Sequence, residues 1–463
     1  MKTPLVVPRF TAEHGRCKYF KVPEAHHTVG LKDTDMVLYV ASRSNYGTWA
    51  IPCAFAEDGR PIAGALHIMP SYTLGVMHFA RTTAHAIAHA LGFSMEQMKK
   101  HDMLLNVTDV RGGSSPVTVV KSPVTLSKAK LHYGCDTLKG MELRNYYEGA
   151  YVWSVRNAKD ELMSQFGKIF AGYYTALTMA ALEDLGYYKA VWGMEEPMAW
   201  GNNSGCEFLD NPCSEKISTT YPDMFCDKKD ALSIRCMSNR QAIGVCTVDA
   251  SLASSGEKET CSVILPPRSG ENLFCTEEGD DTLPGSLHGK GSWCLDAEPF
   301  TLMSDTASNR NFIMHAVCAM VQCEEGKVKV KYLGGSDFES CPEGEFITPK
   351  SDHFKGGRRV KCPRYEEVCT IAADGSSLIN LKKGDHDNDG HGHDDYENDD
   401  NKNDGHGNDG HGNDGHGKGD HGKGDHGKDD HGKDDHDGCA AAVVLSSLLL
   451  AVIAAVVVAT LPL

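Results

Sequence analysis

The chain carries 17 cysteines in 463 residues, and this number constrains its fold more than any other feature. All but Cys439 lie between Cys17 and Cys369, which leaves an even number, sixteen, for pairing. Their spacing matches no zinc finger, so the sequence predicts disulfides and an oxidising compartment, with the connectivity left open. Glycosylation sequons at Asn106 and Asn202 indicate the same compartment.

The stretch from Thr82 to Phe93 places two histidines, His85 and His89, four residues apart. On a helix both imidazoles face one side, within reach of one metal ion, and neutral imidazole is the commonest zinc ligand. Gly92 follows where a helix would end. Two histidines at this spacing, with no other motif, are more often structural than metal-binding. The residues on either side of them are therefore needed to distinguish the two roles. The helix is predicted by apolar residues at spacings of three and four: Met77, Ala80, Ala84, Ile87 and Leu91.

These flanks resemble a known family. His85 to Phe93 is similar to the active-site helix of the leishmanolysin family, the surface zinc metallopeptidases of the metzincin group. Asp160 to Met163 resembles that family's Met-turn, which contains Met163, and Ala171 to Tyr188 resembles the helix after it. The resemblance covers nearly everything from Cys17 to Cys369, and it includes Phe20 to Ala25, Trp200 to Cys206, Tyr221 to Cys226 and Cys362 to Cys369.

Two site positions depart from the family pattern. The residue after the first histidine, a general-base Glu in the family, is Ala86, and such a loss lowers a rate about 10²–10⁴-fold. The resemblance implies one zinc ion held by His85, His89 and a third His, but the third position holds Val152. No histidine lies between His132 and His288, so a shifted alignment supplies none. Catalytic zinc sites normally have three protein ligands.

The resemblance therefore implies a cell-surface zinc metalloendopeptidase homologue that is catalytically impaired or inactive and acts by adhesion or surface binding. Its partners would be protein substrates or surface ligands. One alternative is a residually active zinc endopeptidase that cleaves proteins. Another is a surface metal-binding protein that works through a His-rich stalk.

The expected fold class is α+β. We expect a metzincin-like catalytic domain with an active-site helix and an inserted second subdomain, a Cys-rich strand-containing C-terminal domain and a disordered tail. Met36 to Ala41 predicts a buried strand, and Ala63 to Met69 predicts the edge strand beside the cleft. The expected divisions are a catalytic remnant (1–95), a central subdomain (96–212), the Cys-rich domain (213–383), a stalk (384–438) and a hydrophobic anchor (439–463).

The beginning of the chain contrasts with the predicted compartment. Met1 to Phe10 contains Pro4 and Pro8 and offers no apolar stretch long enough for a signal peptide. The family would also place a pro-segment and more of the catalytic domain before Arg16. The sequence is therefore expected to be an N-terminally truncated, degenerate member of the family.

Residues 384–438 are nearly all Gly, Asp, His, Asn and Lys, which predicts a disordered, extended stalk. The segment holds eighteen acidic and five basic residues, a net charge of −13 out of −17, which argues against nucleic-acid binding. Its ten histidines permit weak metal capture, while the alternative role is a solvated spacer. Seven of these histidines recur every five residues: His406, His411, His416, His421, His426, His431 and His436.

Residues from Cys439 to Leu463 carry no charge and are long enough to span a bilayer. Small residues before this apolar tail predict a glycosylphosphatidylinositol anchor attached at Gly438 or Cys439. A retained tail-anchor helix is the alternative. Both place the protein at the plasma membrane, on the extracellular side.

Overall fold

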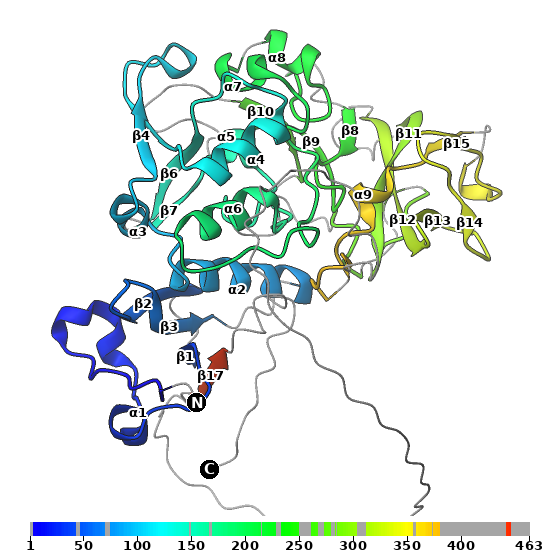
Figure 1. Ribbon diagram of the computed structural model, residues 1–463. Coiled ribbons are helices and arrows are strands. Elements are labelled where there is room, and N and C mark those ends of the chain that lie inside the picture. Colours follow the sequence, from blue (N-terminus) through cyan, green and yellow to red (C-terminus); the bar gives the residue numbers. More distant parts are fainter. Residues whose placement is uncertain are drawn as a thin grey trace, which may run out of the picture. The chain divides into compact units, whose positions relative to one another are not determined.

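The structure is a computed structural model (Figure 1). It describes residues 3–42, 47–69, 75–147, 150–165, 169–213, 215–227, 233–249, 261–266, 273–278, 283, 285–302, 312–354, 358–372, 374–379 and 441–445. The chain divides into a unit of residues 1–381 with 438–463 and a second unit of residues 382–437. The second unit, which contains most of the predicted stalk, lies outside the described residues.

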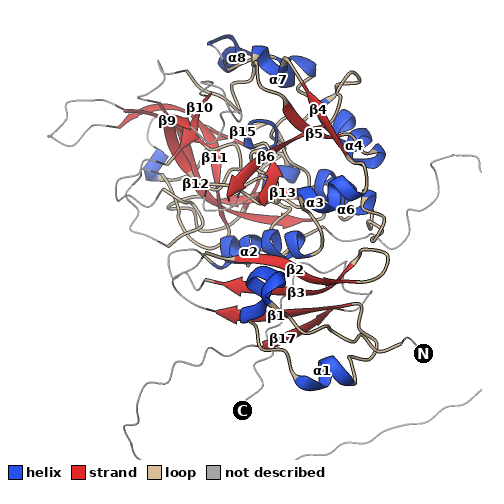
Figure 2. Cartoon of the chain, turned by 90° about the vertical axis from the view of Figure 1, so that its left-hand side faces the viewer, coloured by secondary structure: helices blue, strands red, loops and turns tan. Residues whose placement is uncertain are grey.

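The N-terminal part is a small sheet covered on one face by a long helix (Figure 2). The strand order is β17-β1-β3-β2, with β1 parallel and β2 antiparallel to β3. The buried strand predicted at Met36 to Ala41 is confirmed as β1. The elements are η1 (Ala12–Tyr19), α1 (Glu24–Thr28), β1 (Met36–Ser42), β2 (Trp49–Phe55), β3 (Pro61–Ile68) and α2 (Val76–Ala90).

The prediction of an edge strand at Ala63 to Met69 is wrong. This segment forms β3, which pairs with β1 on one side and β2 on the other. The absence of a side chain at Gly64 lets both neighbouring strands approach, since a Cβ there would meet Met36 and Leu38 of β1 and the Ile51 carbonyl of β2. The edge strand next to β3 is β2.

The central part contains a four-stranded antiparallel sheet, in the order β4-β5-β6-β7, with short helices around it. Helices α4 and α6 pack against each other. The elements are α3 (Met95–Lys100), β4 (Leu104–Val107), η2 (Val110–Gly112), β5 (Val117–Val120), α4 (Pro123–Tyr133), β6 (Met141–Tyr147), β7 (Ala150–Trp153), α5 (Val155–Ala158), α6 (Ala176–Asp184), α7 (Cys206–Asp210) and α8 (Glu215–Thr220).

The C-terminal part is rich in strands, as predicted. Its main sheet runs β10-β9-β8-β12-β11-β16-β15, with β13 and β14 attached beside β12. The elements are β8 (Ser233–Cys236), β9 (Ile243–Asp249), β10 (Cys261–Leu265), β11 (Ser292–Leu302), β12 (Phe312–Glu324), β13 (Lys327–Lys331), β14 (Glu339–Ser340), β15 (Phe346–Ile347), η5 (Asp352–Phe354), β16 (Val360–Lys361) and α9 (Tyr365–Val368).

Eight disulfides pair all sixteen cysteines from Cys17 to Cys369, which confirms the predicted disulfide-rich chain. Six of them lie in the C-terminal part, while one continuous hydrophobic core runs through the N-terminal, central and C-terminal parts. The pairs are Cys17–Cys53, Cys135–Cys206, Cys213–Cys261, Cys226–Cys246, Cys236–Cys294, Cys275–Cys318, Cys323–Cys369 and Cys341–Cys362.

Part of the predicted hydrophobic anchor is a strand. Strand β17 (Ala441–Leu445) pairs antiparallel with β1, from Met36 opposite Leu445 to Val40 opposite Ala441 (Figure 1). The rest of the stretch from Cys439 to Leu463 lies outside the described residues. Within the described part of the chain, no helix is long and apolar enough to cross a membrane.

Candidate metal centre

Helix α2 carries both histidines and is held between the N-terminal sheet and the central part of the chain (Figure 2). Gly92 follows it with a φ of 115°, a conformation that favours glycine, as the sequence predicted. The rotation of the helix is fixed by Arg81, which donates to both carboxylate oxygens of buried Glu196 at 2.5 and 2.8 Å. Arg81 also donates to the Gly172 carbonyl at 3.1 Å.

The two histidines converge through their Nε2 atoms. Nε2 of His85 lies 3.2 Å from Nε2 of His89, and the ring centroids are 4.9 Å apart at nearly right angles. His85 is buried, while His89 is partly buried. The predicted spacing therefore does bring both imidazoles to one point.

Backbone carbonyls fix the tautomer of each ring. Nδ1 of His85 lies 2.6 Å from the Leu162 carbonyl oxygen, and Nδ1 of His89 lies 2.7 Å from that of Phe93. A carbonyl only accepts, so each Nδ1 must donate its proton. In the neutral rings, both lone pairs are then on Nε2 and face each other.

Both rings are neutral at pH 7. Burial, and then the proximity of His89, lower the pKa of His85 to about 3. Burial also lowers the pKa of His89. Neutral imidazole is the form that binds a metal ion.

The segment predicted as the Met-turn lies against His85. The Leu162 carbonyl accepts from His85, and the Leu162 N–H donates to the Tyr173 carbonyl at 2.7 Å. The Met163 carbonyl accepts from Trp153 N–H of β7 at 2.8 Å. This segment therefore joins α2, β7 and the chain that leads into α6.

The two positions at which the sequence predicts departures from the family pattern hold apolar side chains. Ala86 is 2% exposed and offers only a methyl group, and Val152, which precedes Trp153 on β7, is fully buried. Within the described residues, no group of three or more His, Cys, Asp or Glu side chains is arranged to hold a metal ion.

Comparison with known proteins decides the family. The family model described as leishmanolysin, peptidase M8, matches residues 3–375. The chain belongs to the leishmanolysin family. Leishmanolysin of Leishmania major is 35% identical over 405 residues, which cover 80% of this chain and 65% of that protein.

More distant members match as well. The leishmanolysin homolog of Crithidia fasciculata is 32% identical over 80% of this chain and 60% of its own length. A leishmanolysin-like peptidase of Caenorhabditis elegans is 28% identical over 74% of this chain and 67% of its own length. The chain therefore spans about two thirds of the length of these curated relatives.

Membership of the leishmanolysin family implies zinc, and the histidine pair fits this ion as two ligands. Two nitrogens at about 2.0–2.1 Å from a tetrahedral zinc lie roughly 3.3 Å apart. The observed separation is 3.2 Å. The carbonyl that accepts from each Nδ1 is the usual partner behind a zinc-bound histidine.

The other predicted residues lie away from this pair. His78, predicted as structural or exposed, is buried and meets the Phe274 ring edge-on. Asn106 is exposed on β4, and Asn202 is exposed in the turn before α7, so both predicted sequons are accessible. Gly438 and Cys439, the predicted attachment positions, lie outside the described residues.

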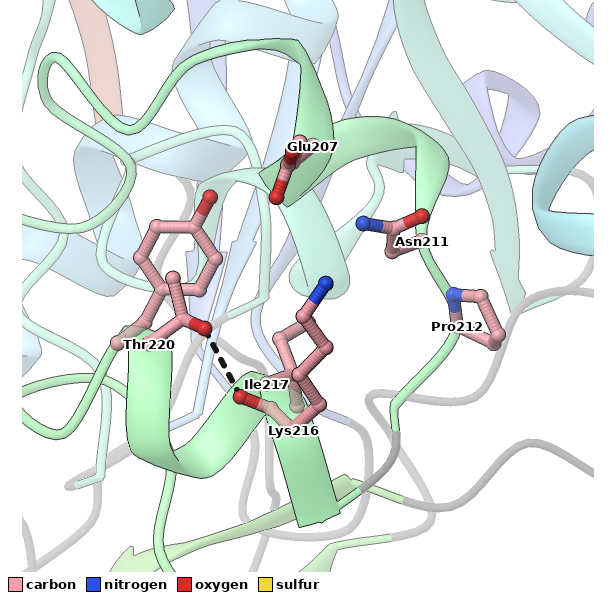
Figure 3. Close-up of a pocket in the computed structure, with 7 residues that line it drawn as sticks. Glu207, Asn211, Pro212, Lys216, Ile217 and Thr220 are labelled. Atoms are coloured by element: carbon pink, nitrogen blue, oxygen red, sulfur yellow. Dashed lines mark hydrogen bonds between the residues drawn. The ribbon is translucent and has the colours of Figure 1, made fainter.

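A separate pocket of about 160 Å³ lies between α7 and α8 (Figure 3). Glu207, Asn211 and Lys216 direct polar groups into it, and the buried side chain of Ile217 also lines it. None of its lining residues is a histidine or cysteine, so it is not part of the metal centre.

The eight disulfides and membership of a family of surface proteases support an extracellular location.

Two supporting contacts were not found by sequence reasoning. Glu161, inside the predicted Met-turn, is a buried carboxylate that accepts hydrogen bonds from Met163 and Thr175. The pair of Arg81 and Glu196 joins residues 115 positions apart. The motif at residues 160–163 located Glu161 but indicated no role for its carboxylate. Nothing local in the sequence indicated the pair of Arg81 and Glu196.

Proposed function

We propose that this chain is a cell-surface leishmanolysin homologue that binds zinc through His85 and His89 and has lost the peptidase reaction. The observation that carries this proposal is the buried methyl group of Ala86, next to a histidine pair that is otherwise arranged for a metal ion. A methyl group neither accepts nor returns the proton of an attacking water.

Each residue of the proposed site has a separate role. Nε2 of His85 and Nε2 of His89 would hold the ion, while the Leu162 and Phe93 carbonyls hold the rings in the binding tautomer. Zinc in such a site polarises a peptide carbonyl as a Lewis acid. Hydrolysis also needs a proton acceptor and a complete ligand set, and the buried side chains at positions 86 and 152 supply neither.

The proposed surface role is binding without cleavage. Attachment of a lipid anchor at Gly438 or Cys439 would remove β17 from the mature protein. The attached chain would present the histidine site and the disulfide-rich C-terminal part to extracellular protein ligands. The lipid anchor is tested by treating intact cells with a phosphatidylinositol-specific phospholipase. Release of the protein supports the anchor, and retention indicates a membrane-spanning tail.

The test of the lost reaction uses the full chain made in a secretory host. Zinc content is measured by mass spectrometry of the metal, and hydrolysis is measured on casein with and without a zinc chelator. We expect one more zinc ion per chain in the wild type than in His85→Ala/His89→Ala, since the stalk histidines are present in both, and no chelator-sensitive hydrolysis in either. His78→Gln is the matched control, since it removes another buried histidine of α2 and should keep the zinc. Chelator-sensitive hydrolysis by the wild type would overturn the proposal.

A further inference from the structure

Glu161 is a fully buried carboxylate that is held by hydrogen bonds and not by a salt bridge within the described residues. It is 0% exposed, and no lysine or arginine in the described part of the chain forms an ion pair with it. Its oxygens accept instead from Met163 N–H at 2.5 Å, from the Thr175 hydroxyl at 2.9 Å and from Thr175 N–H at 3.3 Å. Burial without a cationic partner is costly and raises the pKa of Glu161 to about 7, so the side chain carries its full charge only above that pH, and its position calls for an explanation.

The peptide unit between Leu162 and Met163 supplies this explanation. In a planar trans peptide the C=O and the N–H point in opposite directions. Glu161 accepts from the N–H of this unit, and the C=O of the same unit accepts from Nδ1 of His85 at 2.6 Å. The carboxylate and the imidazole therefore lie on opposite sides of one peptide group.

The same carboxylate also reaches the strand that carries the third ligand position. The Thr178 hydroxyl hydrogen-bonds to Glu161, and it accepts from the indole N–H of Trp153 at 3.0 Å. Trp153 directly follows Val152 on β7. Glu161 thus fixes both the carbonyl behind His85 and the strand beside it.

We propose that Glu161 is a positioning residue that acts on His85 through this peptide group, in a carboxylate–peptide–histidine relay. A negative charge at the N–H end polarises the peptide, which strengthens the acceptor at the C=O end. The stronger acceptor holds His85 in the Nδ1–H tautomer and increases the electron density on Nε2, as a carboxylate bound directly to a zinc-ligating histidine does. No proton moves along the relay. The inference rests on the proposed zinc site for its role, but the hydrogen bonds exist without metal.

His89 provides an internal comparison. Its carbonyl partner, Phe93, begins the peptide unit that ends at Ser94, and no carboxylate within the described residues accepts from Ser94 N–H. The relay therefore predicts that the Nδ1–H proton of His85 resonates further downfield than that of His89 in the metal-free wild type at about pH 8.5, above the raised pKa of Glu161. Histidine-labelled full-length protein, with resonances assigned by His85→Gln and His89→Gln, gives this result without any change at Glu161. Equal shifts, or the reverse order, would overturn the relay.

The variant Glu161→Gln keeps the shape of the side chain and removes its charge. We expect the His85 Nδ1–H resonance to move upfield while that of His89 stays in place. Affinity for Co²⁺, measured by its visible absorption, should fall by about 10–100-fold, with a changed spectrum. Glu142→Gln is the matched control, because it removes the charge of another buried carboxylate, which pairs with Arg111 and not with a residue of α2. It should leave the resonance and the spectrum unchanged.

The two readouts separate the two proposals. An unchanged His85 resonance in Glu161→Gln, or an equal shift in Glu142→Gln, overturns the relay whatever the metal does. A shifted resonance together with no Co²⁺ or Zn²⁺ binding by the wild type keeps the relay and overturns the proposed zinc site. If Glu161→Gln does not fold, the comparison of His85 with His89 in the wild type still decides.

Discussion

The two sides of the histidine pair differ in completeness. The supporting side consists of Glu161, Leu162, Thr175 and Phe93. Each ring Nδ1 donates to a backbone carbonyl there, and the Glu161 carboxylate accepts from Thr175. On the reacting side, defined by the positions of Ala86 and Val152, the side chains are apolar and buried. The resemblance to the family leads us to expect a general base and a third ligand at these two positions.

The difference follows from what each side does for the fold. Removing a supporting contact leaves a buried N–H or carboxylate without a partner, at about 1–3 kcal/mol or more. Alanine at position 86 has the opposite effect, because it is the best helix former and avoids burying a charge. The supporting side is therefore tied to stability, while the reacting side can lose its chemistry and leave the fold intact.

The largest expected effect is the return of activity when the reacting side is rebuilt. Ala86→Glu together with Val152→His should restore zinc-dependent casein hydrolysis at least about 10²-fold above the wild type, since both the proton acceptor and the third ligand are supplied. Ala86→Glu alone should restore little. The measurement is initial rate against zinc concentration.

Adding His85→Ala to the double variant serves as the control and should abolish the recovered activity. Full activity from Ala86→Glu alone would show that Val152 is not the third ligand position. The contrast between the two sides would then reduce to one missing residue.

The next effect comes from breaking the support of α2. Arg81→Met leaves the buried carboxylate of Glu196 without its partner and should lower the free energy of unfolding by about 3–5 kcal/mol. Urea denaturation measures this change. Arg359→Met breaks a pair with Glu298 at the surface and should change stability far less. Equal effects in the two variants would contradict the claim that the support of α2 carries stability.

A smaller effect is expected from acid. The folded pKa of His85 is about 3, below the unfolded value of about 6.5, so protons bind preferentially to the unfolded chain. The stabilisation from neutral His85 is complete above pH 6.5 and is lost as the pH falls toward 3. The loss for this one group is small near pH 6.5 and approaches about 1.4 kcal/mol per pH unit well below it. Urea denaturation of the metal-free chain at pH 7, 6 and 5 should therefore show less acid destabilisation in His85→Gln, by up to this amount per pH unit. Identical slopes would mean that His85 is not held neutral.

Much of the fold and of the candidate site was predictable because short sequence patterns determine it. The helix, its end at Gly92, strand β1, the disulfide-rich strand region and the family all follow from periodicity, composition and short motifs. The position of β3 was not predictable, since an apolar strand of small residues reads the same at an edge or in the middle of a sheet.

The support of the site was also beyond local patterns. Glu161 lies in the motif that predicts the turn, but the groups that donate hydrogen bonds to it depend on how residues 173–178 fold back over residues 161–163. Arg81 and Glu196 meet only in the folded chain. The burial of Glu161 and the tautomer of His85 depend on contacts between residues far apart in the sequence. A single sequence does not show such contacts.

The smallest expected effect tests whether position 86 still has any special demand. Ala86→Gly should lower the free energy of unfolding by about 1 kcal/mol, which is the difference in helix propensity between alanine and glycine. Ala88→Gly is the matched control, because Ala88 is also buried in the interior of α2. Urea denaturation should give the same loss for both, and the His85 Nδ1–H resonance should not move in Ala86→Gly. The contrary outcome is a free energy of unfolding that falls about 2 kcal/mol further in Ala86→Gly than in Ala88→Gly. This result would show that the methyl group of Ala86 makes stabilising packing contacts of its own, because helix propensity alone cannot supply such a difference. The reacting side would then be a remodelled surface with its own packing, and the contrast with the supporting side would be one of function and not of decay.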